Sequence, residues 1–364
     1  MYTIITLLVV IFVLVIAITN QNKFGAIPTG ERLERIKKSP NFKDGKFQNL
    51  SETPQMSEEA RFSTMLKELF FSKNKKPENQ IPSIKTDLHT LNPNEDALVW
   101  FGHSSYLIQI DGKKILVDPV FSGSASPFSF NVKAFDGSNF YQPDDIPEID
   151  YLVITHDHWD HLDYKTVLEL KPKINRIITG LGVGAHFEKW GFDTSKIVET
   201  DWFEDVLLDD GFRFFCTPAR HFSGRGLKHK RSLWVSFLLE TPSQKIFIGG
   251  DGGYNAHFKE IGKKYGPIDL AILENGQYNK AWKYIHLMPE QVLQAASDLK
   301  TKRILPVHSG KFALANHAWN EPLKRITELN KNTIPLVTPQ IGELVYLKNT
   351  KQTFTKWWLN VDAQ

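Results

Sequence analysis

Short hydrophobic runs alternate with turn residues and with helix-like patterns through most of the chain. Runs rich in β-branched and aromatic residues predict strands. The predicted strands cover residues 97–101, 106–110, 115–118, 151–155, 206–208, 212–216, 233–240, 245–249, 270–273 and 303–307. Apolar residues at helical spacing predict helices at 164–170, 181–190 and 289–300. This mixture of strands and helices indicates an α/β fold in which helices cover sheets.

The first twenty residues follow a different pattern, because Tyr2 to Thr19 is uncharged and almost wholly apolar. As a helix this run would be about 27 Å long, close to the roughly 30 Å hydrocarbon core of a bilayer. A secretory signal peptide is the alternative, although the run lacks a basic n-region and a clear cleavage site. Basic residues follow the run and none precedes it, which favours a topology with the body of the protein on the cytoplasmic side of the membrane. We predict a single-pass membrane anchor at residues 1–20.

Residues 21–94 are polar, rich in lysine and interrupted by prolines, as is typical of a linker or of an arm that wraps a domain. One amphipathic helix is predicted within them, from an N-cap at Ser57 to Phe71. Its apolar stripe comprises Phe62, Met65, Leu66, Leu69 and Phe70. Two roles are open for this stripe: packing on the domain that follows, or lying in a membrane interface.

Length and charge set limits on the kind of protein. The chain has 364 residues, which is ample for a large buried core. Its formal net charge of +3 is too small to indicate a nucleic-acid partner. Cys216 is the single cysteine, so an intrachain disulfide is excluded, and its apolar neighbours indicate a buried, inert thiol.

The densest group of metal-binding side chains follows the predicted strand at 151–155. Its members are His156, His158, Asp160 and His161. His156 and His158 point to the same side of an extended chain, and the next turn can bring Asp160 and His161 to a second metal. Imidazole and carboxylate together suit zinc or a similar first-row divalent ion. The alternative is a polar loop whose histidines only cap or solvate, but such loops do not crowd this many ligands together.

The His-X-His-X-Asp-His pattern after an apolar strand resembles the metallo-β-lactamase superfamily. Further segments resemble it in the order that this superfamily uses: residues 99–107, 115–119, 216–221, 248–254 and 306–310. The resemblance covers roughly residues 96 to 347. Within the superfamily, the settings of His221 and His308 look most like the N-acyl phosphatidylethanolamine-hydrolysing phospholipase D family.

The resemblance implies an αββα sandwich for residues 95–364, with a metal centre at one edge between the sheets. It implies that His156, His158 and His221 hold one metal, that Asp160, His161 and His308 hold another, and that Asp251 bridges them. We expect two divalent ions, with zinc (Zn2+) as the first choice, although these ligands also suit iron or manganese. The glycines around Asp251 fit a backbone that passes close to two metals.

The chemistry that follows from such a centre is hydrolysis. Two metals about 3.5–4 Å apart would share a hydroxide that is present at neutral pH and serves as the nucleophile. We expect Asp160 and His286 to be catalytic residues, with His286 binding a phosphate oxygen or protonating a leaving group. The alternative is that His286 is only a loop histidine before a helix, without a catalytic role. His103 either lines the site or has a structural role.

The leading hypothesis is a membrane-associated phosphodiesterase of phospholipase D type that acts on N-acyl phosphatidylethanolamine-like phospholipids. A metal-dependent lactonase and a non-catalytic, membrane-anchored metal-binding scaffold are the alternatives. The complete ligand set argues against the scaffold. Expected partners are the bilayer and its phospholipids, and the phospholipase relatives suggest a homodimer.

Overall fold

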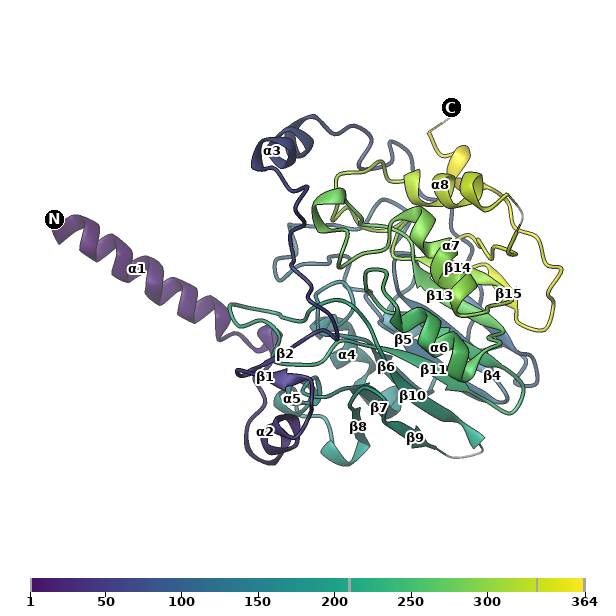
Figure 1. Cartoon of the computed structure of the whole chain (residues 1–364), viewed down its shortest axis with the longest axis horizontal. Helices are drawn as coiled ribbons and strands as arrows, with labels where there is room; N and C mark the ends of the chain where they lie inside the picture. Colours follow the sequence, from purple (N-terminus) through teal and green to yellow (C-terminus); the bar gives the residue numbers. More distant parts are fainter. Residues whose placement is uncertain (1, 209–210, 332, 363–364) are drawn as a thin grey trace.

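Two β-sheets packed face to face, with helices on both outer faces, form the body of the molecule (Figure 1). The computed structural model describes residues 2–208, 211–331 and 333–362. Apolar side chains from both sheets, such as Val117, Ile178, Phe214 and Phe237, fill the space between them. The predicted α/β sandwich of metallo-β-lactamase type is confirmed.

The first sheet has seven strands in the order β15-β3-β4-β5-β6-β7-β8. They are β3 (Ala97–Trp100), β4 (Tyr106–Ile110), β5 (Lys113–Val117), β6 (Ile149–Ile154), β7 (Ile174–Gly180), β8 (Ile197–Thr200) and β15 (Leu344–Tyr346). Neighbours from β15 to β5 are antiparallel, whereas β5, β6, β7 and β8 run parallel to one another. Asp111 and Gly112, which join β4 to β5, have φ of 46° and 77°, as a tight hairpin turn requires.

The second sheet has six strands in the order β14-β13-β12-β11-β10-β9. They are β9 (Asp205–Leu207), β10 (Arg213–Pro218), β11 (Val235–Glu240), β12 (Lys245–Ile248), β13 (Leu270–Glu274) and β14 (Ile304–Val307). Because β11 is antiparallel to both β10 and β12, and β12, β13 and β14 are parallel, β10 runs in the same direction as those three strands.

Helices cover the outer face of each sheet. The first sheet carries α4 (Tyr164–Leu170) and α5 (Gly184–Lys189), and the second carries α6 (His257–Tyr265), α7 (Pro289–Asp298) and α8 (Glu321–Asn330). Short 3-10 helices are η1 (Asn22–Phe24), η2 (Pro143–Asp145), η3 (Lys171–Lys173), η4 (Thr194–Lys196), η6 (Lys280–Trp282) and η7 (Trp357–Leu359). Each outer apolar cluster packs helix side chains against the sheet, which makes the four layers one packed unit.

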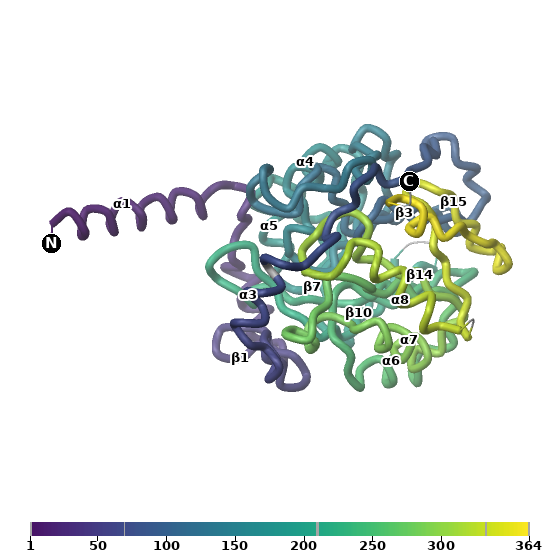
Figure 2. Tube along the Cα trace, turned by 90° about the horizontal axis from the view of Figure 1, so that it is seen from above, coloured from purple at the N-terminus to yellow at the C-terminus, as the bar shows by residue number. Residues whose placement is uncertain are grey.

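The chain before the sheets begins with α1 (Tyr2–Thr19), which projects away from the body in both views (Figures 1 and 2). By length and composition α1 could cross a membrane, and none of its side chains is buried. Next come α2 (Gly30–Lys37), the short hairpin of β1 (Phe42–Lys43) and β2 (Lys46–Phe47), and then α3 (Phe62–Phe71). Between these elements the chain lies along the body.

The predicted amphipathic helix differs from α3 in where it begins. Arg61 occupies the N-cap, whereas the Ser57 hydroxyl donates to the carbonyl of Lys280, so a tertiary contact replaces the expected cap. Within the apolar stripe, Phe62 and Phe70 are 80% and 70% exposed, whereas Met65 is partly buried and lines a pocket with Tyr278 of the domain. The side chain of Leu69 lies outside the described residues. The exposed phenylalanines are available for a membrane interface, while the Met65 side of the helix faces the domain.

Candidate metal centre

The predicted ligands lie in loops at the carboxyl ends of strands. Residues 156–161 follow β6, His221 follows β10, Asp251 follows β12 and His308 follows β14. Since β10, β12 and β14 share one direction, their carboxyl ends meet at one edge of the second sheet, opposite the end of β6. The structure therefore brings together all seven predicted ligands, which are separated by up to 152 positions in the sequence (308 − 156).

The first cluster consists of three imidazoles whose nitrogens face one another. His156 Nε2 lies 3.0 Å from His158 Nδ1, and His221 Nε2 lies 3.2 Å from the same atom. His156 Nδ1 donates to the Thr155 hydroxyl and His221 Nδ1 donates to the carbonyl of Ile285. Both rings therefore present an Nε2 lone pair to the centre of the cluster, as metal ligands do.

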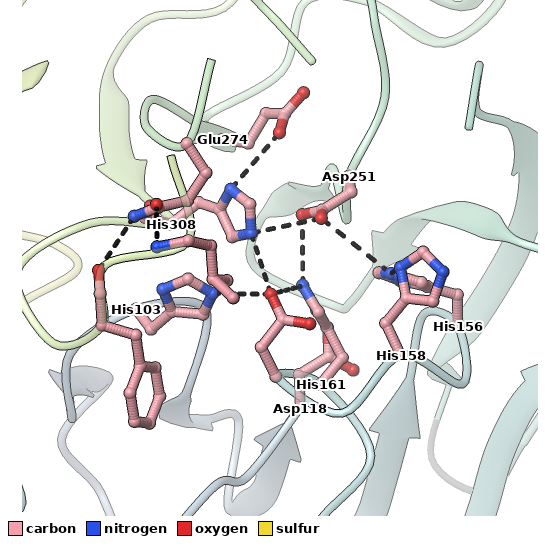
Figure 3. A network of polar contacts seen from close by, with 12 residues as sticks. His103, Asp118, His156, His158, His161, Asp251, Glu274 and His308 are labelled. Atoms are coloured by element: carbon pink, nitrogen blue, oxygen red, sulfur yellow. Dashed lines mark hydrogen bonds and ion pairs between the residues drawn. The ribbon is translucent and has the colours of Figure 1, made fainter. Parts of the chain in front are cut away.

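The second cluster combines Asp160, His161 and His308, and Asp251 lies between the two clusters (Figure 3). Asp160 Oδ2 is 3.5 Å from His161 Nε2 and 3.3 Å from His308 Nε2. Asp251 Oδ1 and Oδ2 lie 3.2 Å from the Nε2 atoms of His161 and His308, respectively. Asp251 Oδ2 is also 3.8 Å from His221 Nε2 in the first cluster. This is the position that a bridging carboxylate would need.

The donor set of these clusters fits divalent metal ions. His161 Nε2 and Asp251 Oδ1 are buried and lie 3.2 Å apart, but neither makes a hydrogen bond, although a buried polar atom normally does. Two imidazole nitrogens about 3 Å apart do not attract each other unless a cation or a proton lies between their lone pairs. Nitrogen and carboxylate oxygen are the ligands that zinc and related ions accept. The ligand role of each residue stays a prediction.

The two clusters differ in their protonation. Burial, reinforced by neighbouring imidazoles, holds the pKa of His156 and of His221 well below the usual range, so both rings are neutral. In the second cluster burial opposes the positive charge, but the carboxylates of Asp251 and its neighbours raise the pKa of His161 well above the usual range. The first cluster is thus ready to bind a cation, whereas the second must lose a proton to do so.

Asp118, at the end of β5, fixes the orientation of His161. Its carboxylate accepts a hydrogen bond of 2.8 Å from His161 Nδ1. It also accepts from the backbone N–H and the hydroxyl of Thr155, at 2.9 and 2.7 Å. One carboxylate thereby joins β5 to the histidine loop and leaves His161 Nε2 free for a metal, which is a common arrangement behind metal-binding histidines.

Glu274, at the end of β13, has a similar role on the other side of the centre. Its Oε2 accepts from His286 Nδ1 at 2.6 Å and lies 3.4 Å from His308 Nδ1. Its Oε1 accepts from the backbone N–H groups of Gly252 and Leu287, at 3.0 and 2.8 Å. Glu274 therefore holds both the loop of Asp251 and the predicted catalytic His286, whose Nε2 is left available for substrate.

The backbone around the centre is tightly packed. Gly250 has a φ of 60°, and a Cβ at Gly253 would lie 2.1 Å from the carbonyl oxygen of Tyr284. These two positions require glycine, in agreement with the expected close approach of this loop. His103 and His308 also have positive φ, 53° and 67°, and their loops exchange backbone hydrogen bonds. His103 Nε2 lies 2.9 Å from Asp160 Oδ2, so His103 contacts a predicted ligand.

The arm that precedes the sheets contributes to the centre. Asn49 accepts from the backbone N–H of His221 at 3.1 Å and donates to its carbonyl at 2.8 Å. Gln55 and Met56 line a cavity of about 370 Å³ together with five of the predicted ligands. A larger cavity of about 740 Å³ lies elsewhere, along α6 and residues 49–51. We assign the functional site to the smaller cavity because the metal-binding groups open into it.

Several residues of this site were not identified from the sequence. Asp118 and Glu274 each stand directly at the end of a hydrophobic strand, the same signal that identified the histidine loop. Asn49 carries no such signal, because its role depends on where the arm crosses the domain. Asp157, between His156 and His158, accepts from His186 Nε2 at 3.0 Å and from the Ser232 hydroxyl at 2.7 Å. These partners of Asp157 could not be assigned from the spacing of residues in the sequence.

The chain is similar to several known proteins. A family model described as a beta-lactamase superfamily domain matches residues 113–309. An uncharacterised protein of Mycobacterium tuberculosis is 38% identical over 296 residues, covering 79% of each chain. N-acyl-phosphatidylethanolamine-hydrolyzing phospholipase D 1 of Caenorhabditis elegans is 28% identical over 269 residues, covering 67% of this chain and 74% of its own.

Among solved structures, Igni18, a metallo hydrolase from the archaeon Ignicoccus hospitalis, aligns with a TM-score of 0.52 at 21% identity. The alignment covers 69% of this chain and 97% of Igni18, and it supports the fold. The family model spans more than half of the chain and includes all seven predicted ligands. The chain belongs to the metallo-β-lactamase superfamily and is a metal-dependent hydrolase of that family.

Proposed function

We propose that the protein is a membrane-anchored phosphodiesterase of phospholipase D type that acts on N-acyl phosphatidylethanolamine-like phospholipids. The observation that carries this proposal is the composition of the cavity. His158, Asp160, His221, Asp251 and His308 line one part of it, and Met56, Phe222, Trp282, Ile285 and Leu314 line another. A polar, metal-binding region beside apolar side chains suits a substrate with a charged phosphate and a hydrophobic portion.

The metals and His286 would divide the chemistry between them. When bound, two divalent ions would lower the pKa of a water molecule to about 7 and neutralise charge on the phosphate oxygens. His286 lies at the cavity with Nδ1 held by Glu274, so its Nε2 can donate a proton to the departing alcohol oxygen. Water is added, the bond between phosphorus and the ethanolamine oxygen breaks, and phosphatidic acid and an N-acylethanolamine are released.

The names of relatives and the N-terminal helix support the lipid substrate. The relative from C. elegans is named as an enzyme that hydrolyses N-acyl phosphatidylethanolamine, and its match covers two thirds of this chain. Helix α1, if it is retained in a bilayer, would keep the cavity beside its lipid substrate. We further propose that the metal is zinc, that the catalytic domain lies on the cytoplasmic side of the membrane and that the protein forms a homodimer. These parts of the proposal rest on the sequence and on the family resemblance.

The test is hydrolysis of N-acyl phosphatidylethanolamine in mixed micelles by the purified full chain, before and after chelation and after zinc is restored. We expect chelator-sensitive release of phosphatidic acid and N-acylethanolamine in equal amounts. Release of diacylglycerol would contradict the phospholipase D type of cleavage. An enzyme that opens acyl lactones but leaves phosphodiesters intact would replace this proposal with the lactonase alternative.

A further inference from the structure

The loop at residues 224–231, directly after the predicted ligand His221, lies beside the end of α1. A Cβ at Gly226 would be 3.5 Å from the ring of Phe24, which belongs to η1 just after α1. Figures 1 and 2 both show this teal-green loop on the side of the body from which α1 projects. Leu227 at the loop is 73% exposed, and the exposed Lys228 follows it.

Other exposed apolar side chains lie on the same side. Phe130 is 76% exposed and stacks on Phe128, whose ring lies 5.0 Å from the ammonium of Lys23. Since Lys23 follows α1 within a few residues, this aromatic pair is also close to the end of the helix. Helix α3, with its exposed Phe62 and Phe70, also lies toward this side in both views. Scattered exposed apolar residues are ordinary, but a group of them beside one helix end is not.

Basic side chains accompany these apolar ones. Lys228 is exposed in the loop, and Lys230 and Arg231 follow it. The loop is joined to the β1–β2 hairpin, because the Phe47 N–H donates to the Lys230 carbonyl, and Lys43 and Lys46 of that hairpin are exposed. Asp44, at the hairpin turn, is the acidic exception. Basic residues at a membrane surface are attracted to anionic lipids.

We propose that these elements form a membrane-docking surface, in which the loop at 224–231 inserts Leu227 into the headgroup region of an anionic bilayer. The partner is a bilayer because the surface adjoins the end of α1 and combines exposed apolar tips with basic flanks, as interfacial segments do. This inference rests on the membrane anchor of the proposed function.

The docking surface is connected to the metal centre. Phe222 lies between them: its ring is 4.6 Å from that of His158 and 6.2 Å from that of His229 in the loop. Phe222 also lines the cavity. A loop held in the headgroup region would therefore keep the cavity close to the lipid phosphates, so that the substrate need not leave the bilayer completely.

The test places an environment-sensitive fluorophore on single engineered cysteines of the full chain in lipid nanodiscs. Cys216 is buried and burial raises its pKa, so a maleimide will label the engineered cysteine selectively. Leu227→Cys reports on the loop and Val9→Cys reports on α1. Leu207→Cys is the matched control, because Leu207 is 66% exposed on β9, away from α1.

We expect the probe at position 227 to shift to shorter wavelength and to be quenched by doxyl-labelled lipids, as at position 9, whereas the probe at position 207 is unaffected. Lys228→Glu should reduce the ratio of inserted to free loop by about fivefold or more in nanodiscs that contain phosphatidylglycerol. Quenching at position 9 without quenching at 227 would overturn the docking surface and leave the anchor intact. Absence of quenching at position 9 would overturn the anchor and the docking surface together.

Discussion

Single residues behind the predicted ligands decide how well the centre can hold a metal. Asp118 orients His161 through a 2.8 Å hydrogen bond. We predict that Asp118→Asn weakens metal binding about 10- to 100-fold, because the amide removes the charge and one acceptor behind the imidazole. Chelator competition measures this affinity. Asp150→Asn is the control, since Asp150 accepts from the Lys114 N–H away from the centre; equal affinities for both variants would refute the role of Asp118.

His286 should affect the reaction and not the metals. With Nδ1 bound to Glu274, its Nε2 is the proton donor of the proposed mechanism. We predict that His286→Gln lowers kcat by about 10²- to 10⁴-fold while the metal content stays at the wild-type level. Steady-state kinetics together with elemental analysis test this. His89→Gln, at an exposed histidine, should leave kcat unchanged, and loss of metal in His286→Gln would instead make His286 a ligand.

Protonation of His308 should make the stability of the metal-free chain depend on pH. Burial would lower the pKa of His308, but Asp251, Asp160 and Glu274 outweigh it and raise that pKa to about 10. A raised pKa adds stability that is fully present below the unfolded value of about 6.5 and is lost as pH rises through 10. Urea unfolding of the chelated chain should therefore show a declining free energy of unfolding from pH 7 to 10. His308→Gln should flatten this decline, and an unchanged slope would contradict the assignment.

At the scale of elements, the arm before the sheets stabilises the metal centre. Asn49 makes hydrogen bonds with both backbone groups of His221, and its Oδ1 also accepts from Trp234 Nε1 at 2.9 Å. We predict that Asn49→Ala lowers the free energy of unfolding by about 1–3 kcal/mol, because buried groups lose their partners. Chemical denaturation measures the loss. Asn94→Ala, on the surface, should cost much less, and equal costs would show that the arm is not specifically bound there.

Strands with a strong hydrophobic pattern were predictable, and elements defined by tertiary contacts were not. The strand before the histidine loop is a continuous apolar run, as a buried parallel strand should be. β7 contains Asn175 and Arg176, and the edge strands β8 and β15 are only four and three residues long. Helix α6 was missed because Gly262 lowers its helix propensity. The structure explains that glycine, since a Cβ there would lie 1.9 Å from the Asp298 carbonyl of α7.

The helix in the arm shows how tertiary structure can override a local signal. Ser57 and the acidic residues after it have the composition of a helix N-terminus. In the structure both the hydroxyl and the N–H of Ser57 donate to the segment at 280–281. As a result, the helix begins at Phe62. Sequence pattern alone cannot weigh a capping hydrogen bond against a tertiary one of similar strength.

At the scale of the whole molecule, strand direction explains why ligands distant in sequence converge. β6 and three parallel strands of the second sheet end at the same edge, so the polar residues that follow them share one site. The ligand set could be predicted because the histidine cluster follows a recognisable strand and because the segments around His221, Asp251 and His308 resemble the superfamily. The residues that hold these ligands in place could not all be predicted, because Asn49 reaches the site from the arm, whose path over the domain depends on tertiary contacts.

The central claim is that this edge holds two catalytic metal ions. The most direct measurement is the metal content of the purified full chain by mass spectrometry, paired with phosphodiester hydrolysis before and after chelation. We predict close to two divalent ions per chain, with hydrolysis lost on chelation and recovered when zinc is restored. Folded protein without stoichiometric metal, or with hydrolysis that survives removal of its metal, would contradict the account.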